Sequence, residues 1–319
     1  MKLALRGLAG FLILALVVLP VFYFNPLWVA DQELHLKLWR EGVQSKYVEA
    51  GGYRMHYLEA LPTDGTPGTP LLLVHGLGAR AEDWSAMIPA LAAKGFHVYA
   101  PDLLGYGLSA RPADGSYSIA MEEKAVTEFM KAVGLSRADV GGWSMGGWVT
   151  MKLALDHPEL VNRLVVYDSA GTYFPPTFGA DLFVPADAAG VQRLVTILSP
   201  HPRQMPDFVT KALLRKFAEN GWVINRSMAA MTNGRDLLDF RLHEMQRPTL
   251  VVWGSKDDLI PLTVGQKIHE LIPGSVLNIV EGCGHLAPLE CSGPVVKSTV
   301  DFLRTEPAMQ GGERVVPAQ

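Results

Sequence analysis

The chain has 319 residues and a formal net charge of −4, because 28 Lys and Arg face 32 Asp and Glu. This balance argues against a nucleic-acid partner, since nucleic-acid-binding domains usually have a basic footprint. With 49% hydrophobic and 19% charged residues, the composition also excludes a disordered chain. The two cysteines, Cys283 and Cys291, are too few for a disulfide framework or a thiolate metal cluster, and their closeness in sequence does not establish a bridge.

An apolar segment lies near the N-terminus. Residues 7–24 contain no charged side chain, and about 20 such residues cross the ~30 Å hydrocarbon core of a bilayer. We predict that residues 1–30 form a single-pass membrane anchor. The alternative is a cleaved secretory signal, but Trp28 stands where its cleavage site requires a small residue. Lys2 and Arg6 before the span favour a cytoplasmic N-terminus, with the rest of the chain outside the cytoplasm.

Three features follow before the main body of the chain. Residues 31–43 have apolar side chains near helical spacing and predict a helix beside the membrane. Residues 46–60 predict a β-hairpin, because two runs rich in aromatic and β-branched residues flank Gly51 and Gly52, which favour a tight turn. Residues 62–70, rich in Pro and Gly, predict a loop.

From Leu71 onwards, apolar strand-like runs alternate with helix-like runs. The strand-like runs are LLLVHG, HVYAPD, ADVGGWS, RLVVYDSA, TLVVWGS and LNIVEGCGH, and the helix-like runs are residues 84–94, 119–133, 145–157 and 261–271. Such an alternation predicts an α/β fold with a mostly parallel sheet that helices cover on both faces. Reactive groups in these sheets gather at the carboxyl ends of the strands.

A nucleophile motif, G-x-S-x-G, follows the third of these strands. It places Ser144 between Trp143 and Met145, at the turn from the strand into a helix. Such a sharp turn strains the serine backbone and exposes its hydroxyl beside the positive helix N-terminus. The alternative is a serine that only caps a glycine-rich helix start.

A serine nucleophile needs a base, and the base needs an orienting carboxylate. Of the nine histidines, His285 stands out because it follows a Gly-Cys-Gly loop after the last strand. Asp257 follows TLVVWGS by two residues and is the predicted acid. Asp168, at the end of the preceding strand, and Asp258 remain alternative acids.

These motifs together resemble the α/β-hydrolase family over about residues 53–303. The matching segments are His75-Gly76-Leu77-Gly78, Pro101 to Ser109, Gly142 to Gly147, Trp253-Gly254 with Asp257 and Pro261, and Gly284-His285. The chain order Ser, Asp, His is also that of this family. Within the family, the chain is similar to membrane-anchored monoacylglycerol-lipase-like and bacterial lipase/esterase members.

The resemblance implies a role for each site residue. Ser144 would be the nucleophile, His285 the base and Asp257 the acid, with the backbone N–H groups of Leu77 and Met145 as the oxyanion hole. His75 and Asp102, in the matching loops, would be structural members.

The resemblance also implies a domain arrangement. The hydrolase core would comprise residues 31–170 and 248–306, with a helical cap at residues 171–247 inserted after the sixth strand. Residues 307–319 look disordered.

The expected activity is hydrolysis of carboxylic esters, with short-to-medium acyl chains or monoacylglycerols as substrates and no cofactor or metal. The alternatives are a carbon–carbon bond hydrolase or another hydrolase of the same fold, and a non-catalytic binding protein. Carbon–carbon bond hydrolases commonly have a Gly-Pro-rich stretch after HG and an Asn before the serine, whereas this chain has HGLGARAEDW and Trp143. No oligomeric state is predicted.

Overall fold

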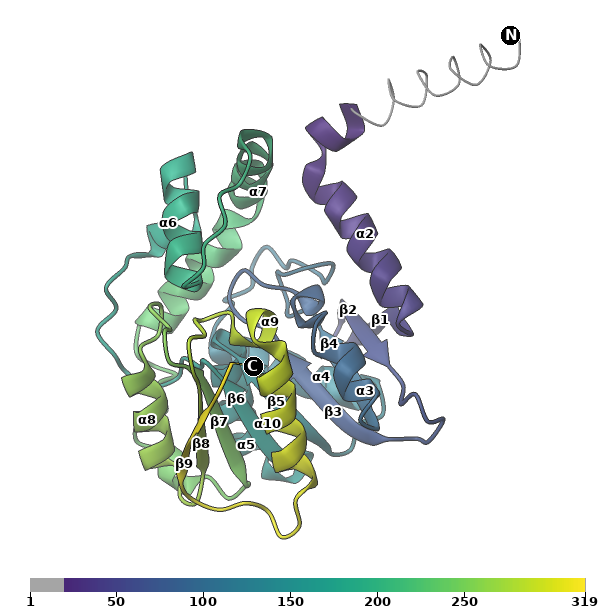
Figure 1. The fold of residues 1–319 in the computed structure, drawn as a ribbon, viewed down its shortest axis with the longest axis vertical. Coiled ribbons are helices and arrows are strands. Elements are labelled where there is room, and N and C mark those ends of the chain that lie inside the picture. Colours follow the sequence, from purple (N-terminus) through teal and green to yellow (C-terminus); the bar gives the residue numbers. More distant parts are fainter. Residues whose placement is uncertain (1–19, 319) are drawn as a thin grey trace.

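The computed structural model describes residues 20–318, which build a nine-stranded sheet (Figure 1). In spatial order the strands are β1 (Val43–Ala50), β2 (Tyr53–Ala60), β4 (Phe96–Pro101), β3 (Thr69–Val74), β5 (Ala138–Trp143), β6 (Val161–Tyr167), β7 (Thr249–Gly254), β8 (Val276–Val280) and β9 (Glu313–Val316). The pairs β1–β2 and β2–β4 are antiparallel, and the other neighbours are parallel. The predicted mostly parallel sheet is therefore confirmed.

The predicted hairpin is formed by β1 and β2, which pair from Val43 with Ala60 to Ala50 with Tyr53. Gly51 and Gly52 form its two-residue turn with φ of 57° and 85°. Turns of this kind need positive φ at both central residues, which glycine adopts without steric cost.

Helices cover both faces of the sheet, and the strand side chains alternate between two cores. Leu72 and Val74 of β3 belong to the core that includes residues of α4 (Ile119–Ala132), α5 (Met145–Asp156) and α8 (Leu262–Leu271). Leu71 and Leu73 belong to the core that includes residues of α3 (Ile88–Ala92) and α10 (Ser292–Arg304). This period of two is the expected consequence of a pleated strand buried on both sides.

The helix predicted over residues 84–94 is instead two shorter elements, the 3₁₀ turn η1 (Ala81–Trp84) and α3. Pro89 lies in the first turn of α3. Proline favours that position because it has no N–H to bond in the preceding turn, so it marks a helix start rather than a helix interior.

The chain between β6 and β7, predicted as a cap, contains η3 (Ala180–Phe183), α6 (Ala188–Leu198), α7 (Asp207–Thr232) and η4 (Leu242–Glu244). Before β1 lies α2 (Pro26–Arg40), which contacts β1 and α7. The remaining short helices are η2 (Pro158–Leu160) and α9 (Ala287–Glu290). Figure 1 shows α2, α6 and α7 projecting from the same end of the sheet.

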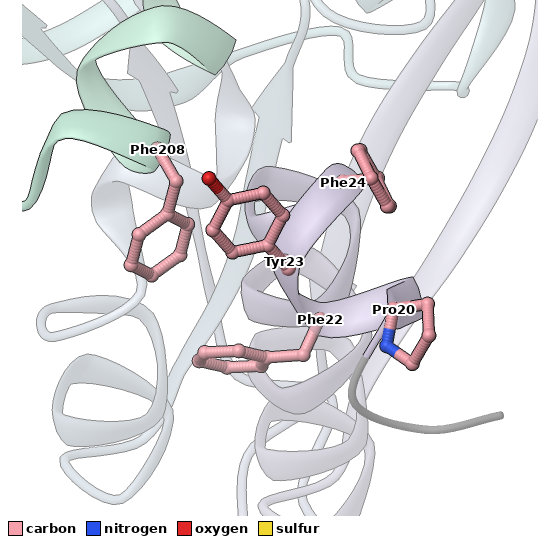
Figure 2. A pocket seen from close by; sticks show the side chains of 5 residues that line it. All are labelled: Pro20, Phe22, Tyr23, Phe24 and Phe208. Carbon is pink, nitrogen blue, oxygen red and sulfur yellow. The ribbon is translucent and has the colours of Figure 1, made fainter. Parts of the chain in front are cut away.

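An aromatic cluster joins the segment before α2 to the start of α7. Tyr23 stacks on Phe208 with ring centroids 5.5 Å apart, and Phe22 lies 5.8 Å from the same ring (Figure 2). Arg215 of α7 donates a 3.1 Å hydrogen bond to the Phe24 carbonyl oxygen. Phe24 nevertheless remains 64% exposed, so the cluster presents aromatic surface to its surroundings.

The predicted anchor at residues 1–30 lies mostly outside the described residues. Within residues 20–318, no helix combines the length and the hydropathy that a bilayer-crossing segment needs.

The disorder expected for residues 307–319 is wrong for β9, which pairs with β8 from Leu277–Glu313 to Val280–Val316. Without β9, the backbone N–H and C=O groups along one side of β8 would have no strand partner. Val315 and Val316 also favour extended backbone.

Candidate active site

Ser144 lies at the junction of β5 and α5, with φ of 58° and ψ of −121°. This backbone conformation is strained for a residue with a Cβ atom, as the motif predicts. The Ser144 N–H donates to the Tyr167 carbonyl oxygen (2.9 Å), and the Ser144 carbonyl oxygen accepts from the Ala170 N–H (3.2 Å). A Cβ atom on Gly146 would collide with the Val74 carbonyl oxygen, which explains the glycine of the motif.

The structure brings Ser144, His285 and Asp257 together. Ser144 Oγ lies 3.0 Å from His285 Nε2, and His285 Nδ1 lies 2.8 Å from Asp257 Oδ2. The other oxygen of Asp257, Oδ1, accepts the N–H groups of Leu259 (2.9 Å) and Ile260 (2.8 Å). With Asp257 on Nδ1, Nε2 is left to accept the serine proton, so the arrangement can activate Ser144 as a nucleophile.

The alternative acids are placed differently. Asp258 is exposed and makes no hydrogen bond within residues 20–318. Asp168 is fully buried, and its Oδ1 accepts the Gly254 N–H at 2.7 Å rather than a hydrogen bond from His285. Asp257 is therefore the carboxylate that contacts the base.

The predicted oxyanion donors flank Ser144. A Cβ atom on Gly76, beside Leu77, would lie 2.9 Å from Ser144 Cβ, so the loop after β3 packs directly against Ser144. Met145 follows Ser144 at the start of α5. In the described part of the chain, the N–H groups of Leu77 and Met145 have no hydrogen-bond acceptor. They are available to stabilise a developing negative charge.

The loops around the site depend on a buried His–Asp pair that the sequence did not predict. Asp102 accepts hydrogen bonds from His56 Nδ1 (2.7 Å), the Ala81 N–H (2.7 Å) and the Leu108 N–H (2.8 Å). Burial opposes the charged form of Asp102, but the hydrogen bond from His56 and the nearby charges hold its pKa below the usual value. His56, which lies in the β1–β2 hairpin, is completely buried.

Both ring nitrogens of His75 hydrogen-bond to the backbone of loops near the site. Its Nε2 accepts the Leu103 N–H at 3.0 Å, so Nδ1 carries the proton that is donated to the Gly76 carbonyl oxygen at 2.8 Å. The ring therefore ties the loop after β3 to the loop after β4 and has no contact with Ser144 Oγ.

The loop of His285 is fixed by a disulfide bond between Cys283 and Cys291, which the sequence left open. The cap lies against this loop, because a Cβ atom on Gly284 would be 2.6 Å from Pro200 Cδ. Within residues 20–318, no group of three or more His, Cys, Asp or Glu side chains could hold a metal ion.

The second cap contact is with the loops that follow β3 and β4. A Cβ atom on Gly105 would lie 2.7 Å from Val223 of α7, and one on Gly78 would lie 3.8 Å from Ile224. Tyr106 Oη also lies 2.7 Å from Ser227 Oγ of α7. The end of α6 thus lies against the loop of His285, and the middle of α7 lies against the loops after β3 and β4. Ser144 itself is half-buried.

A comparison with protein families agrees with this geometry. The profile of the family described as "alpha/beta hydrolase fold" matches residues 69–290. The chain belongs to the α/β-hydrolase family.

Relatives of this α/β hydrolase include enzymes of two reaction types. A 2-hydroxymuconate semialdehyde hydrolase from Pseudomonas sp. (strain CF600) is 31% identical over 75% of this chain and 88% of its own length. A monoacylglycerol lipase from Xenopus laevis is 25% identical over 87% of this chain and 88% of its own. Among solved structures, a membrane phospholipase A, described as a bacterial virulence factor, matches with a TM-score of 0.79 and 26% identity, over 95% of this chain and 98% of its own.

Proposed function

We propose that this α/β hydrolase cleaves carboxylic esters through an acyl-enzyme on Ser144. The observation that carries the proposal is the 3.0 Å contact between Ser144 Oγ and His285 Nε2, with Asp257 on the other ring nitrogen. A bare serine hydroxyl is a weak nucleophile, and an adjacent oriented imidazole is the usual means of activating it.

The mechanism follows from this arrangement. His285 Nε2 takes the proton of Ser144 as Oγ attacks the ester carbonyl carbon, and the N–H groups of Leu77 and Met145 stabilise the oxyanion. His285 then gives the proton to the leaving alcohol oxygen, which leaves an acyl group on Ser144. Water, deprotonated by His285, releases the acid and restores the serine. Each oxyanion donor is worth about 3 kcal/mol of barrier.

Carbon–carbon bond hydrolysis is the second candidate, because the Pseudomonas relative is 31% identical. Its substrate carries a carboxylate, which is usually bound by a cation. The arginines beside the loop after β3 and on α7 are already engaged: Arg80 with Asp31 and Glu82, Arg215 with the Phe24 carbonyl oxygen, and Arg226 with the Ala113 carbonyl oxygen. The sequence match to the monoacylglycerol lipase also covers 87% of this chain, against 75% for the Pseudomonas relative. Both observations support ester hydrolysis.

For the substrate, we propose esters of short-to-medium acyl chains or monoacylglycerols. Apolar cap residues lie beside the loops around Ser144, with Ile224 near Gly78 and Pro200 near Gly284, and such apolar surroundings suit an acyl chain. Each buried methylene contributes about 0.8 kcal/mol until the apolar space is filled. Activity should therefore rise and then fall with chain length.

The proposed location is a membrane, with residues 1–30 as a single-pass anchor and the hydrolase domain outside the cytoplasm. The exposed aromatic side chains of Phe22, Tyr23 and Phe24 support it, since aromatic residues are enriched at membrane–water interfaces. The Cys283–Cys291 bond supports the extracytoplasmic side, because disulfides persist in oxidising compartments.

The activity is tested with p-nitrophenyl esters from acetate to palmitate, monoacylglycerols and 2-hydroxymuconate semialdehyde, comparing kcat/KM. We expect ester turnover with an optimum below palmitate, and none in Ser144→Ala, which should also lose fluorophosphonate labelling. Turnover of the semialdehyde without ester turnover would favour carbon–carbon bond hydrolysis. Labelling that survives in Ser144→Ala would remove Ser144 as the nucleophile.

The location is tested on membranes of expressing cells. Carbonate washing should leave the protein in the pellet, and protease added to intact spheroplasts should remove the C-terminal domain. Release by carbonate would favour a cleaved signal, and full protection from protease would reverse the topology.

A further inference from the structure

Asp168 lies between the two turns that hold the nucleophile and the acid, but the proposed mechanism does not use it. Its neighbours Tyr167 and Ala170 bond both backbone groups of Ser144, at 2.9 and 3.2 Å. On the other side, Asp168 Oδ1 accepts the N–H of Gly254, whose carbonyl oxygen accepts the Asp257 N–H at 3.3 Å. Asp168 thus lies within the segment that hydrogen-bonds Ser144, and its own side chain hydrogen-bonds the turn that carries Asp257.

The backbone at Asp168 is held in an unusual conformation. Its φ is 43°, and only Tyr117 and Ser144 among the other non-glycine residues described also have positive φ. Its N–H donates to the Val252 carbonyl oxygen at 3.0 Å. A strained residue of this kind persists only where its surroundings hold it. Here, the hydrogen bonds between the turn of Ser144 and the turn of Asp257 hold Asp168 in this conformation.

The Asp168 side chain has one partner too few for a carboxylate ion. It is fully buried, Oδ1 has the Gly254 N–H, and Oδ2 has no hydrogen-bond partner within residues 20–318. A buried ionised carboxylate normally accepts several hydrogen bonds, whereas a carboxylic acid carries a proton on one oxygen. Burial, and then the negative charge of Asp257, raise the pKa of Asp168 well above its usual value.

Asp257 has the opposite environment. Its Oδ1 has two backbone donors and its Oδ2 has His285, so three donors stabilise its negative charge. Two neighbouring buried carboxyls cannot both ionise easily, and the charge is favoured on the one with more hydrogen-bond donors.

We propose that Asp168 is a positioning residue that remains a neutral carboxylic acid, holds the turn of Asp257 against the turn of Ser144, and leaves the negative charge to Asp257. The proposal rests on the function proposed above for Ser144, His285 and Asp257. The titratable groups that face this region are Asp257, from the turn after β7, and His285, which Asp257 contacts. The first two turns of α5, which packs against β6, have no titratable side chain.

The test uses the full-length protein and the rate at which a fluorophosphonate labels Ser144, from neutral to alkaline pH. Asp168→Asn keeps an oxygen for the Gly254 N–H and has no charge. At neutral pH we expect it to label within about tenfold of the wild type, whereas Asp257→Asn should lose on the order of 10⁴-fold. A comparable loss in Asp168→Asn would show that an ionised Asp168 is needed and would overturn the proposal.

The pH profile separates positioning from a structural role. The wild-type rate should fall at alkaline pH as Asp168 loses its proton and repels Asp257, and Asp168→Asn should lack this fall. The matched control is Asp139→Asn, which removes another buried carboxyl of the sheet and should keep the wild-type profile. If Asp168→Asn and the wild type fall at the same pH, the proposal is wrong.

Thermal melting shows whether Asp168→Asn folds. If it does not fold, a second variant, Asp168→Ser, keeps the proposal testable. Asp168→Ser is smaller, so it cannot overfill the site, and it should label more slowly but without the alkaline fall. An unchanged alkaline fall in Asp168→Ser would also overturn the proposal. Because labelling needs no ester substrate, a protein that labels but hydrolyses no ester would refute the proposed substrate class and leave this test intact.

Discussion

Trp143 Nε1 donates a 2.8 Å hydrogen bond to the main-chain carbonyl oxygen of His285. The two residues are 142 positions apart, and the bond joins the strand that ends just before Ser144 to the loop that carries His285. The Trp143 ring is only 5% exposed and packs edge-on against Trp84, at 6.1 Å between centroids. Trp143, the residue before the proposed nucleophile, therefore fixes the main chain of His285, the proposed base.

Trp143→Phe should lower kcat with little change in KM. It removes one neutral hydrogen bond, which contributes about 1 kcal/mol, or roughly fivefold in rate. KM should be nearly unchanged because the lost bond orients His285 and does not bind substrate. Steady-state kinetics on a p-nitrophenyl ester measure both values.

The matched control is Trp148→Phe. It loses a similar bond, from Trp148 Nε1 to the Asp236 carbonyl oxygen at 2.7 Å, which does not involve His285. Equal effects on kcat in the two variants would argue against a specific role for Trp143.

Asp257→Asn should reduce kcat by about 10⁴-fold, because an amide in this position orients the wrong tautomer of the base. Asp258→Asn is the control, because Asp258 is exposed. Like other surface substitutions, it should change kcat by no more than about threefold. A large loss of kcat in Asp258→Asn together with a small loss in Asp257→Asn would make Asp258 the acid instead.

Local sequence patterns were sufficient for the parts of the fold that depend on neighbouring residues. The hairpin was predictable because Gly51 and Gly52 separate two β-prone runs, and the parallel strands because their apolar runs are continuous. Ser144, Asp257 and His285 could be proposed together because each follows a strand, and parallel strands bring their carboxyl ends to one edge of the sheet.

The features that the sequence did not predict depend on partners distant in the chain. β9 is a four-residue strand in a polar tail, and only the free side of β8 makes it extended. His56 looks like one more residue of the hairpin until Asp102 is found beside it. The link from Asp168 to Gly254 has no local signature, because a buried aspartate at a strand end is compatible with several roles.

Asp102→Asn should destabilise the protein in a pH-dependent way. The folded-state pKa of Asp102 lies below the unfolded value of 3.8, so its contribution is present above that value and is lost as pH falls through the folded-state pKa. At neutral pH the variant should lose about 3 kcal/mol of unfolding free energy, because it leaves His56 without its charged partner.

Urea unfolding measures this difference at neutral and acidic pH. The difference between wild type and variant should shrink in acid, and Asp114→Asn, an exposed control, should change stability by less than about 0.5 kcal/mol at either pH. A difference that stays constant into acid would mean that the charge of Asp102 does not stabilise the fold.

The Cys283–Cys291 bond should stabilise both the protein and the position of His285. It closes a loop with a sequence separation of 8 that contains His285 and α9. Loop-closure entropy predicts a contribution of about 2 to 3 kcal/mol for a loop of this size. In the double variant Cys283→Ala and Cys291→Ala, both the melting temperature and kcat should fall, because the loop that carries His285 then loses its covalent closure. Dithiothreitol should lower the activity of the wild type and leave that of the double variant unchanged, so the double variant is the control for other effects of the reductant.

Two free thiols in protein purified under non-reducing conditions, or a reductant effect that persists in the double variant, would refute this role of the bond. Either result would also remove the support that the bond gives to an extracytoplasmic hydrolase domain.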